Sequence, residues 1–294
     1  MPRSRGQIIL VSAFALAVTF LSLALVLNTA IYTQSLATRE TVDGYPAVDL
    51  RLSAGETGEF LLRAVNDNQS IDGYEAKRAR FERWITRFSH ATNTHALTRG
   101  TLRNVTVVAT HPGTAIRQPA VSSYPNGTFE VASGVSDVRR ARFTVTDGNT
   151  TTPLVIRVTN GSRTWTMKIW ETSAGAYDVT VHAPTGTETR TGIGEGTLRI
   201  RPTNGTYEGT EWPILRFQDR MNGSYTLFIE NGSVATGTFR LTVNEPKSEL
   251  EYETAAGVQH VPVVYNATLA VRFASGDLTV RTNVTVAPEG RATR

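Results

Sequence analysis

Cysteine is absent from this chain of 294 residues, which excludes disulfide bonds, thiol catalysis and cysteine-based zinc sites together. Lysine is scarce, because only Lys77, Lys168 and Lys247 stand among the 30 basic residues and all the others are arginines. Beyond residue 38 the chain has 28 basic and 26 acidic residues, so the isoelectric point near 9.5 reflects a small excess of arginine. This balance predicts no binding of nucleic acid.

Catalytic and cofactor motifs are lacking as well. The sequence contains no HExxH pair, no GxSxG elbow and no phosphate-binding loop. The histidines of the chain are His90, His95, His111, His182 and His260. No two of them stand at a spacing typical of a metal site. Acidic residues such as Glu208 and Glu211 would serve glycoside hydrolysis only if they faced each other across a cleft. We therefore expect no enzymatic activity, no cofactor and no metal.

The longest uncharged segment is Ile8–Leu27, twenty residues in which only three hydroxyl side chains are polar. At about 1.5 Å per residue, a helix of this length crosses the ~30 Å hydrocarbon core of a membrane. Arg3 and Arg5 are the only charges before it, so the positive-inside rule predicts a cytoplasmic N-terminus and an extracellular C-terminal domain. The alternative is a secretory peptide cleaved after Ala37, although the apolar part of such peptides spans only about 7–15 residues.

Small and hydroxyl residues line one face of this predicted membrane helix. They recur at gaps of three, four and three, and they are Ser12, Ala15, Thr19 and Ser22. Helices approach each other closely in lipid where small residues meet. This face is therefore a candidate surface for packing against another membrane helix.

The residues directly before the apolar segment are Arg5, Gly6, Gln7 and Ile8. This order of a basic, a small, a polar and an apolar residue resembles the leader of archaeal type IV pilin-like proteins. Residues 5–40 are also similar to the start of uncharacterised haloarchaeal pilin-like membrane proteins, and residues 264–290 resemble their C-terminal ending. The resemblance implies that a cytoplasmic peptidase cuts after Gly6 and that the protein assembles with itself or with other pilin-like subunits. A plain signal anchor, which is not cleaved, is the alternative.

Beyond the membrane, the helix is expected to continue to residue 43, because Gly44 and Pro46 are the first helix breakers. Residues 56–90 predict mostly helix with a break at 66–73, since apolar residues recur there with a period near 3.6. The members of this apolar stripe are Tyr74, Phe81, Trp84, Ile85 and Phe88.

The second of these helices is also basic. Its cationic residues are Lys77, Arg78, Arg80, Arg83 and Arg87. A basic amphipathic helix binds an anionic membrane surface or a partner helix, or it packs on the rest of the domain with its basic face in water. The second interpretation is favoured.

From Thr101 onward apolar and polar residues alternate, which predicts about twelve short strands and an antiparallel β-sandwich. Asn160–Gly161 and Asn231–Gly232 each predict a tight hairpin of type I′, because Asn-Gly tolerates positive φ at both central positions. Residues 261–264 and 268–273 predict two separate strands. Aromatic residues in such strands are ordinarily core, so Trp165, Trp170 and Trp212 are expected to be buried.

Ten of the fourteen asparagines begin an Asn-X-Ser/Thr triplet, the acceptor for N-glycosylation. They are Asn68, Asn104, Asn126, Asn149, Asn160, Asn204, Asn222, Asn231, Asn266 and Asn283. Turn chemistry explains part of this excess, since five of the ten are followed by glycine. The remainder favours an exported glycoprotein.

The predicted fold class is thus an N-terminal transmembrane helix with a short helical stalk, followed by a mainly antiparallel β-sandwich ectodomain. The predicted segments are a cytoplasmic leader (1–6), the membrane helix and its extension (7–43), a helical or linker region (44–100), a β-rich extracytoplasmic domain (101–290) and a tail (291–294). The resemblance implies a cell-surface structural protein, a pilin-like subunit or a minor component of a surface appendage or secretion-type assembly. A signal-anchored receptor or adhesin, or a secreted glycan hydrolase that uses Glu208 or Glu211, are the alternatives.

Overall fold

The computed structural model of the chain describes residues 45–172, 175–276 and 278–288. The predicted leader at residues 5–8, the apolar segment Ile8–Leu27 and its small-residue face lie outside these described residues. Within the described ranges, no helix is both long enough and apolar enough to cross a membrane.

Two helices open the described chain, α2 (Tyr45–Asp67) and α3 (Tyr74–Leu97). Among the described residues, 45–55 are therefore helical as well, ahead of the predicted helix from residue 56. Pro46 stands in the first turn of α2, where the missing N–H needs no partner within the helix. The predicted break between the two helices is confirmed at residues 68–73.

The strands form two sheets in which all neighbours run antiparallel. The eight-stranded sheet has the spatial order β10 (Thr210–Glu211), β9 (Thr206–Tyr207), β8 (Leu198–Arg201), β3 (Val138–Asp147), β12 (Thr236–Val243), β1 (Leu102–Ser123), β13 (Gln259–Ala274), β14 (Thr279–Val286). The six-stranded sheet has the order β2 (Thr128–Val135), β11 (Tyr225–Glu230), β4 (Leu154–Thr159), β5 (Thr164–Glu171), β6 (Tyr177–Ala183), β7 (Gly186–Ile193). Three short 3₁₀ turns complete the described elements: η1 (Pro213–Leu215), η2 (Phe217–Asp219) and η3 (Gly232–Val234).

The two sheets share one hydrophobic core, as expected of a β-sandwich. Phe143 and Phe239 enter this core from the eight-stranded sheet, and Leu227 enters it from the six-stranded sheet. Trp165 and Trp212 are buried in it, as predicted. Trp170, the third tryptophan expected in the core, is only half-buried on β5.

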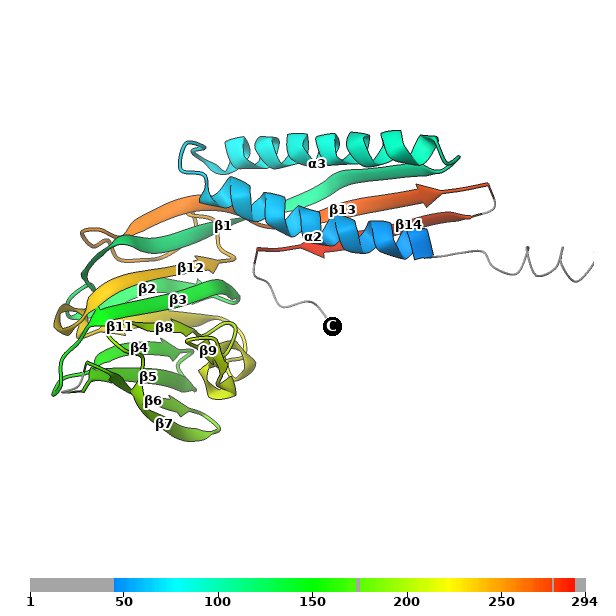
Figure 1. Cartoon of the computed structure of the whole chain (residues 1–294). Helices are drawn as coiled ribbons and strands as arrows, with labels where there is room; N and C mark the ends of the chain where they lie inside the picture. Colours follow the sequence, from blue (N-terminus) through cyan, green and yellow to red (C-terminus); the bar gives the residue numbers. More distant parts are fainter. Residues whose placement is uncertain (1–44, 173–174, 277, 289–294) are drawn as a thin grey trace, which may run out of the picture.

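A second core joins the helices to the far part of the eight-stranded sheet, where α2 and α3 lie along β1, β13 and β14 (Figure 1). Six of the seven buried residues of α2 recur every three or four positions, which places those six on one face. They are Ala47, Leu50, Ala54, Gly58, Leu62, Val65 and Asn66. Gly58 lets the helix approach β13, since a Cβ there would lie 2.8 Å from Leu269 Cδ1.

The apolar stripe of α3 faces the same core. Phe81 and Ile85 are buried, and the other three members of the stripe pack partly buried against the cluster. The favoured interpretation of this helix is therefore confirmed, with Arg78, Arg80, Arg83 and Arg87 exposed. Lys77 is the exception among these basic residues, because it is buried.

One of the two predicted hairpins exists, with a different turn. Strands β4 and β5 pair directly, and the turn at Asn160–Gly161 joins them. The turn is held by Asn160 Oδ1, which accepts the backbone N–H groups of Ser162 and Arg163. Of the two central residues only Gly161 has positive φ, so the turn is not of type I′.

The second predicted hairpin is wrong. Strand β11 lies in the six-stranded sheet between β2 and β4, whereas β12 lies in the eight-stranded sheet between β3 and β1. Asn231, at φ 57°, leads into the η3 turn, which carries the chain from one sheet to the other. An Asn-Gly pair fixes a local reversal, but whether the two arms then pair depends on the sheet contacts available to each.

Two further strand predictions need correction. Residues 261–264 and 268–273 are parts of the single long strand β13, because a bulge opposite His111 and Pro112 carries the strand past Tyr265 without ending it. Strand β7 has no apolar alternation, since seven of its eight residues are exposed, and periodicity did not predict it.

Candidate functional site

The first candidate surface is the outward face of α2. Of the seven large apolar side chains that stand exposed in the described residues, four belong to this helix. They are Tyr45, Val48, Leu52 and Phe60, with exposed fractions of 83, 54, 55 and 68%. Gaps of three, four and eight residues place them on one side, away from the face that packs on the sheet. Helix α2 is thus apolar on two sides, and only one of them is covered within the described chain.

The second candidate surface is a row of arginines on the eight-stranded sheet. Arg240 of β12 stands directly opposite Arg117 of β1 and opposite Arg142 of β3. Each alternates along its strand with residues of the sandwich core such as Phe239, so the arginines point to the outer face of the sheet. A fourth arginine, Arg140, lies two residues before Arg142. We call the hollow lined by these four arginines and Asp67 the arginine pocket; its volume is about 360 Å³.

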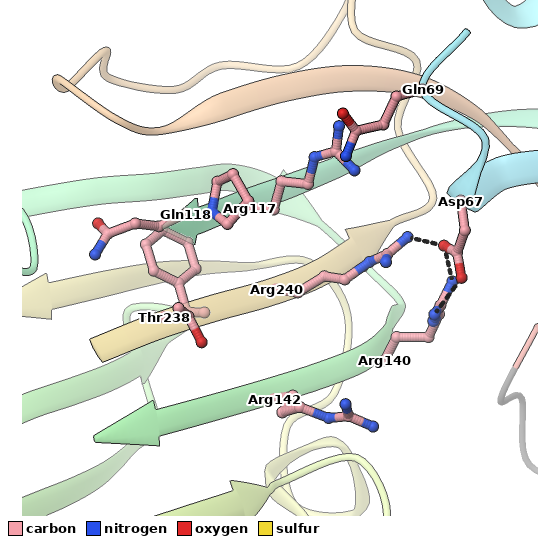
Figure 2. A pocket seen from close by; sticks show the side chains of 10 residues that line it. Asp67, Gln69, Arg117, Gln118, Arg140, Arg142, Thr238 and Arg240 are labelled. Atoms are coloured by element: carbon pink, nitrogen blue, oxygen red, sulfur yellow. Dashed lines mark hydrogen bonds and ion pairs between the residues drawn. The ribbon is translucent and has the colours of Figure 1, made fainter. Parts of the chain in front are cut away.

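Asp67, the last residue of α2, is the single acidic residue that lines the arginine pocket. Its carboxylate accepts two hydrogen bonds from Arg140, at 3.0 and 3.3 Å, and a third bond from Arg240 (Figure 2). Burial alone would raise the pKa of Asp67, but the hydrogen bond from Arg140 and the charges of both arginines outweigh burial and lower it. The neighbouring Asn66 fixes the same helix end by bonding the backbone N–H and C=O of Val264.

Arg140 owes its position to a β-bulge. Between Arg139 and Arg142, strand β3 has one residue more than β12 has between its paired positions. Arg140 has a φ of 57°, a left-handed conformation that is uncommon and strained for a residue with a side chain. The bulge turns Arg140 toward Asp67, which it bonds, whereas no bond joins Arg142 to Asp67 (Figure 2).

Lys77 of α3 lies close to this network and is the buried exception among the basic residues of its helix. Only 1% of it is exposed, and its ammonium donates to the carbonyl oxygen of Pro262 at 2.9 Å. Burial, with a further contribution from the charge of Arg117, lowers the pKa of Lys77 to about 8. Positive charge is therefore in excess around the arginine pocket.

Replacing Lys77 by methionine is expected to raise stability at pH 7, because a similar apolar chain fills the space without burying a charge. The lysine pKa falls from 10.5 to about 8 on folding, so the unfolded state binds more protons between pH 8 and 10. Wild-type stability gains from deprotonation over that window. The advantage of Lys77→Met should therefore shrink by about 1–2 kcal/mol between pH 7.5 and 10.

Urea unfolding of the wild type and of Lys77→Met across this pH range measures the effect. Lys168→Met is the control, because Lys168 is a half-buried lysine on β5. Comparing the two variants removes the contributions of all other titrating groups, because both variants share them. An advantage that stays constant up to pH 10 would contradict a buried ammonium at position 77.

The other predicted site residues are dispersed. All ten glycosylation asparagines lie in the described chain, seven exposed and three half-buried; the half-buried ones are Asn149, Asn160 and Asn266. Glu208 accepts the backbone N–H of Arg199, and Glu211 pairs with Arg216 at 3.0 Å, so both carboxylates have structural partners. Among the described residues, no group of three or more His, Asp or Glu side chains could hold a metal ion.

Comparison with known proteins adds a family of unknown function. Residues 2–144 match the model of this family, DUF7261. The matched stretch contains α2, α3, β1 and β2, together with both arginines that β3 contributes to the arginine pocket. No curated protein and no solved structure matches the chain.

Proposed function

We propose that the protein is a structural subunit of the cell surface, anchored by its N-terminal apolar segment, whose copies associate through the outward face of α2. The observation that carries the proposal is the outward face of α2, on which Val48, Leu52 and Phe60 stand exposed among the described residues. Exposed apolar patches on soluble surfaces mark contacts with other molecules. The resemblance of residues 5–8 and of the following apolar segment to pilin-like proteins supports the same function.

Two features make a second copy of this chain the favoured occupant. The outward face belongs to the element that follows the predicted anchor, so anchored copies would present it side by side. Its charged neighbours are of both signs, since Asp49 and Glu56 stand exposed beside Arg51 and Arg63 on the same helix. Opposite charges on one helix allow complementary pairs between two copies.

A single introduced cysteine tests the association, because the chain has no cysteine of its own. Leu52→Cys should form crosslinked dimers with a short bis-maleimide in native membranes. Val121→Cys is the matched control, since Val121 on β1 is also apolar and 63% exposed but lies away from α2. We expect the yield of dimer to be several-fold higher at position 52.

A second change separates assembly from random collision. In the Leu52→Cys protein, replacing Ala15 and Thr19 by leucine keeps the predicted span apolar but adds bulk to its small-residue face, so insertion should persist while crosslinking falls. Monomer at position 52, or equal yields at positions 52 and 121, would overturn association through α2.

A further inference from the structure

The arginine pocket holds more positive charge than the fold itself neutralises. Four guanidinium groups line it against one carboxylate, and Asp67 already binds two of them. Arg142 has no hydrogen bond or ion pair with the described part of the chain, and Arg117 bonds only the neutral side chain of Gln259. Like charges directly opposite each other across strands destabilise a sheet. The two ends of the row, Arg117 and Arg142, therefore lack a counter-charge among the described residues, whereas Arg240 is paired with Asp67.

The free donors of the pocket suit an oxyanion. The Nε atom of Arg240 is buried and has no hydrogen-bond partner within the described residues. Neighbouring strands lie about 4.8 Å apart, so guanidinium groups on adjacent strands can contact one tetrahedral anion from two sides. The fork of N–H donors on arginine matches sulfate and phosphate oxygens in geometry.

The pocket is also preorganised. Asp67 holds Arg140 and Arg240, so ligand binding does not need to order their side chains. The strained backbone of Arg140 serves the same arrangement, since the bulge aims this residue at Asp67. The volume of about 360 Å³ leaves room for a group larger than the anion alone.

The position of the pocket favours a soluble ligand over a lipid headgroup. Asp67 ends α2, whereas the predicted anchor precedes the other end of this helix at Tyr45. At about 1.5 Å per residue, the 23 residues of α2 hold these ends roughly 33 Å apart. We propose that the arginine pocket binds a sulfate or phosphate group carried by a soluble ligand.

Inorganic sulfate and phosphate are the probes, each added to the detergent-extracted full chain and compared with sodium chloride at equal ionic strength. Both anions should raise the melting temperature of the wild type beyond the effect of chloride. The double variant Arg117→Gln, Arg142→Gln should bind them at least about tenfold more weakly in calorimetry, because it loses two charged donors. Arg87→Gln, an exposed change on α3, is the matched control and should bind like the wild type.

The difference in melting temperature between the double variant and the wild type should also change sign when the anion is added. Without sulfate or phosphate at low ionic strength the double variant should melt at or above the wild type, because the repulsion in the row is relieved. With either anion it should melt below the wild type. The proposal is overturned if neither anion exceeds chloride, if the double variant responds like the wild type, or if phosphatidic-acid vesicles bind at the pocket while both inorganic anions fail.

Discussion

Replacing Gly237 by alanine is expected to lower the free energy of unfolding by about 3 kcal/mol or more and the melting temperature by roughly 6–12 °C. A Cβ at this position would collide with the carbonyl oxygen of Thr144 and lie 2.8 Å from the hydroxyl oxygen of Tyr124. That hydroxyl donates to the same carbonyl at 2.9 Å, so neither group can move alone without losing a part-buried hydrogen bond. Strand β12 is paired on both sides, which prevents the backbone from shifting away.

Thermal and denaturant unfolding of the purified chain measure this loss. Gly276→Ala is the matched control, because nothing lies within 4 Å of a Cβ built there and no positive φ applies. The control should stay within about 0.5 kcal/mol of the wild type. Equal stability of the two variants would show that β3 and β12 can separate at Gly237 without cost.

Gly237 stands at an irregularity in the strand pairing, and the extra residue lies on the opposite strand. The pairing of β12 with β3 shifts between Thr236 and Gly237, and the additional residue is Thr146 of β3. Glycine is needed because β3 bulges toward it. A glycine inside a strand pattern indicates that another backbone comes close, but it does not indicate which strand carries the extra residue.

Local periodicity was sufficient for α3, but it predicted only the part of α2 from residue 56 onward. The stripe of α3 was predictable because Phe81 and Ile85 recur at helical spacing. Lys77 stands four residues before Phe81 and therefore on the same helix face, so its burial was also predictable from its spacing. Its charge alone predicts the opposite, because the other basic residues of α3 are exposed. A lone lysine in line with an apolar stripe predicts a buried ammonium that needs a carbonyl partner.

The arginine pocket could not have been predicted. Its residues come from positions 67, 117, 140, 142 and 240, and their proximity depends on the order and register of β1, β12 and β3. Alternation with core residues tells which face Arg240 occupies, but not which residues stand opposite it. Pairing between strands far apart in sequence is set by global packing, which single-strand patterns do not contain.

Replacing Asp67 by asparagine is expected to lower the free energy of unfolding by about 2–3 kcal/mol at pH 7. The shape of the side chain is kept, but Arg140 and Arg240, with side chains only 10 and 25% exposed, lose their counter-charge. The loss is smaller than for a fully buried pair, because the side chain of Asp67 is 37% exposed. Asp49→Asn, an exposed change on the same helix, is the control and should have little effect.

The pH dependence of this loss has a definite sign. The pKa of Asp67 is lowered in the folded state, so the stability it contributes is present above the unfolded value near 4 and disappears as the pH falls through the folded value. The difference between wild type and Asp67→Asn should therefore be constant from about pH 5 to 7 and should shrink below pH 4. Added sulfate should restore part of the loss, because a bound anion replaces the missing negative charge. Urea unfolding with and without sulfate measures both effects, and a difference that persists undiminished at pH 2 would show that Asp67 does not act through its charge.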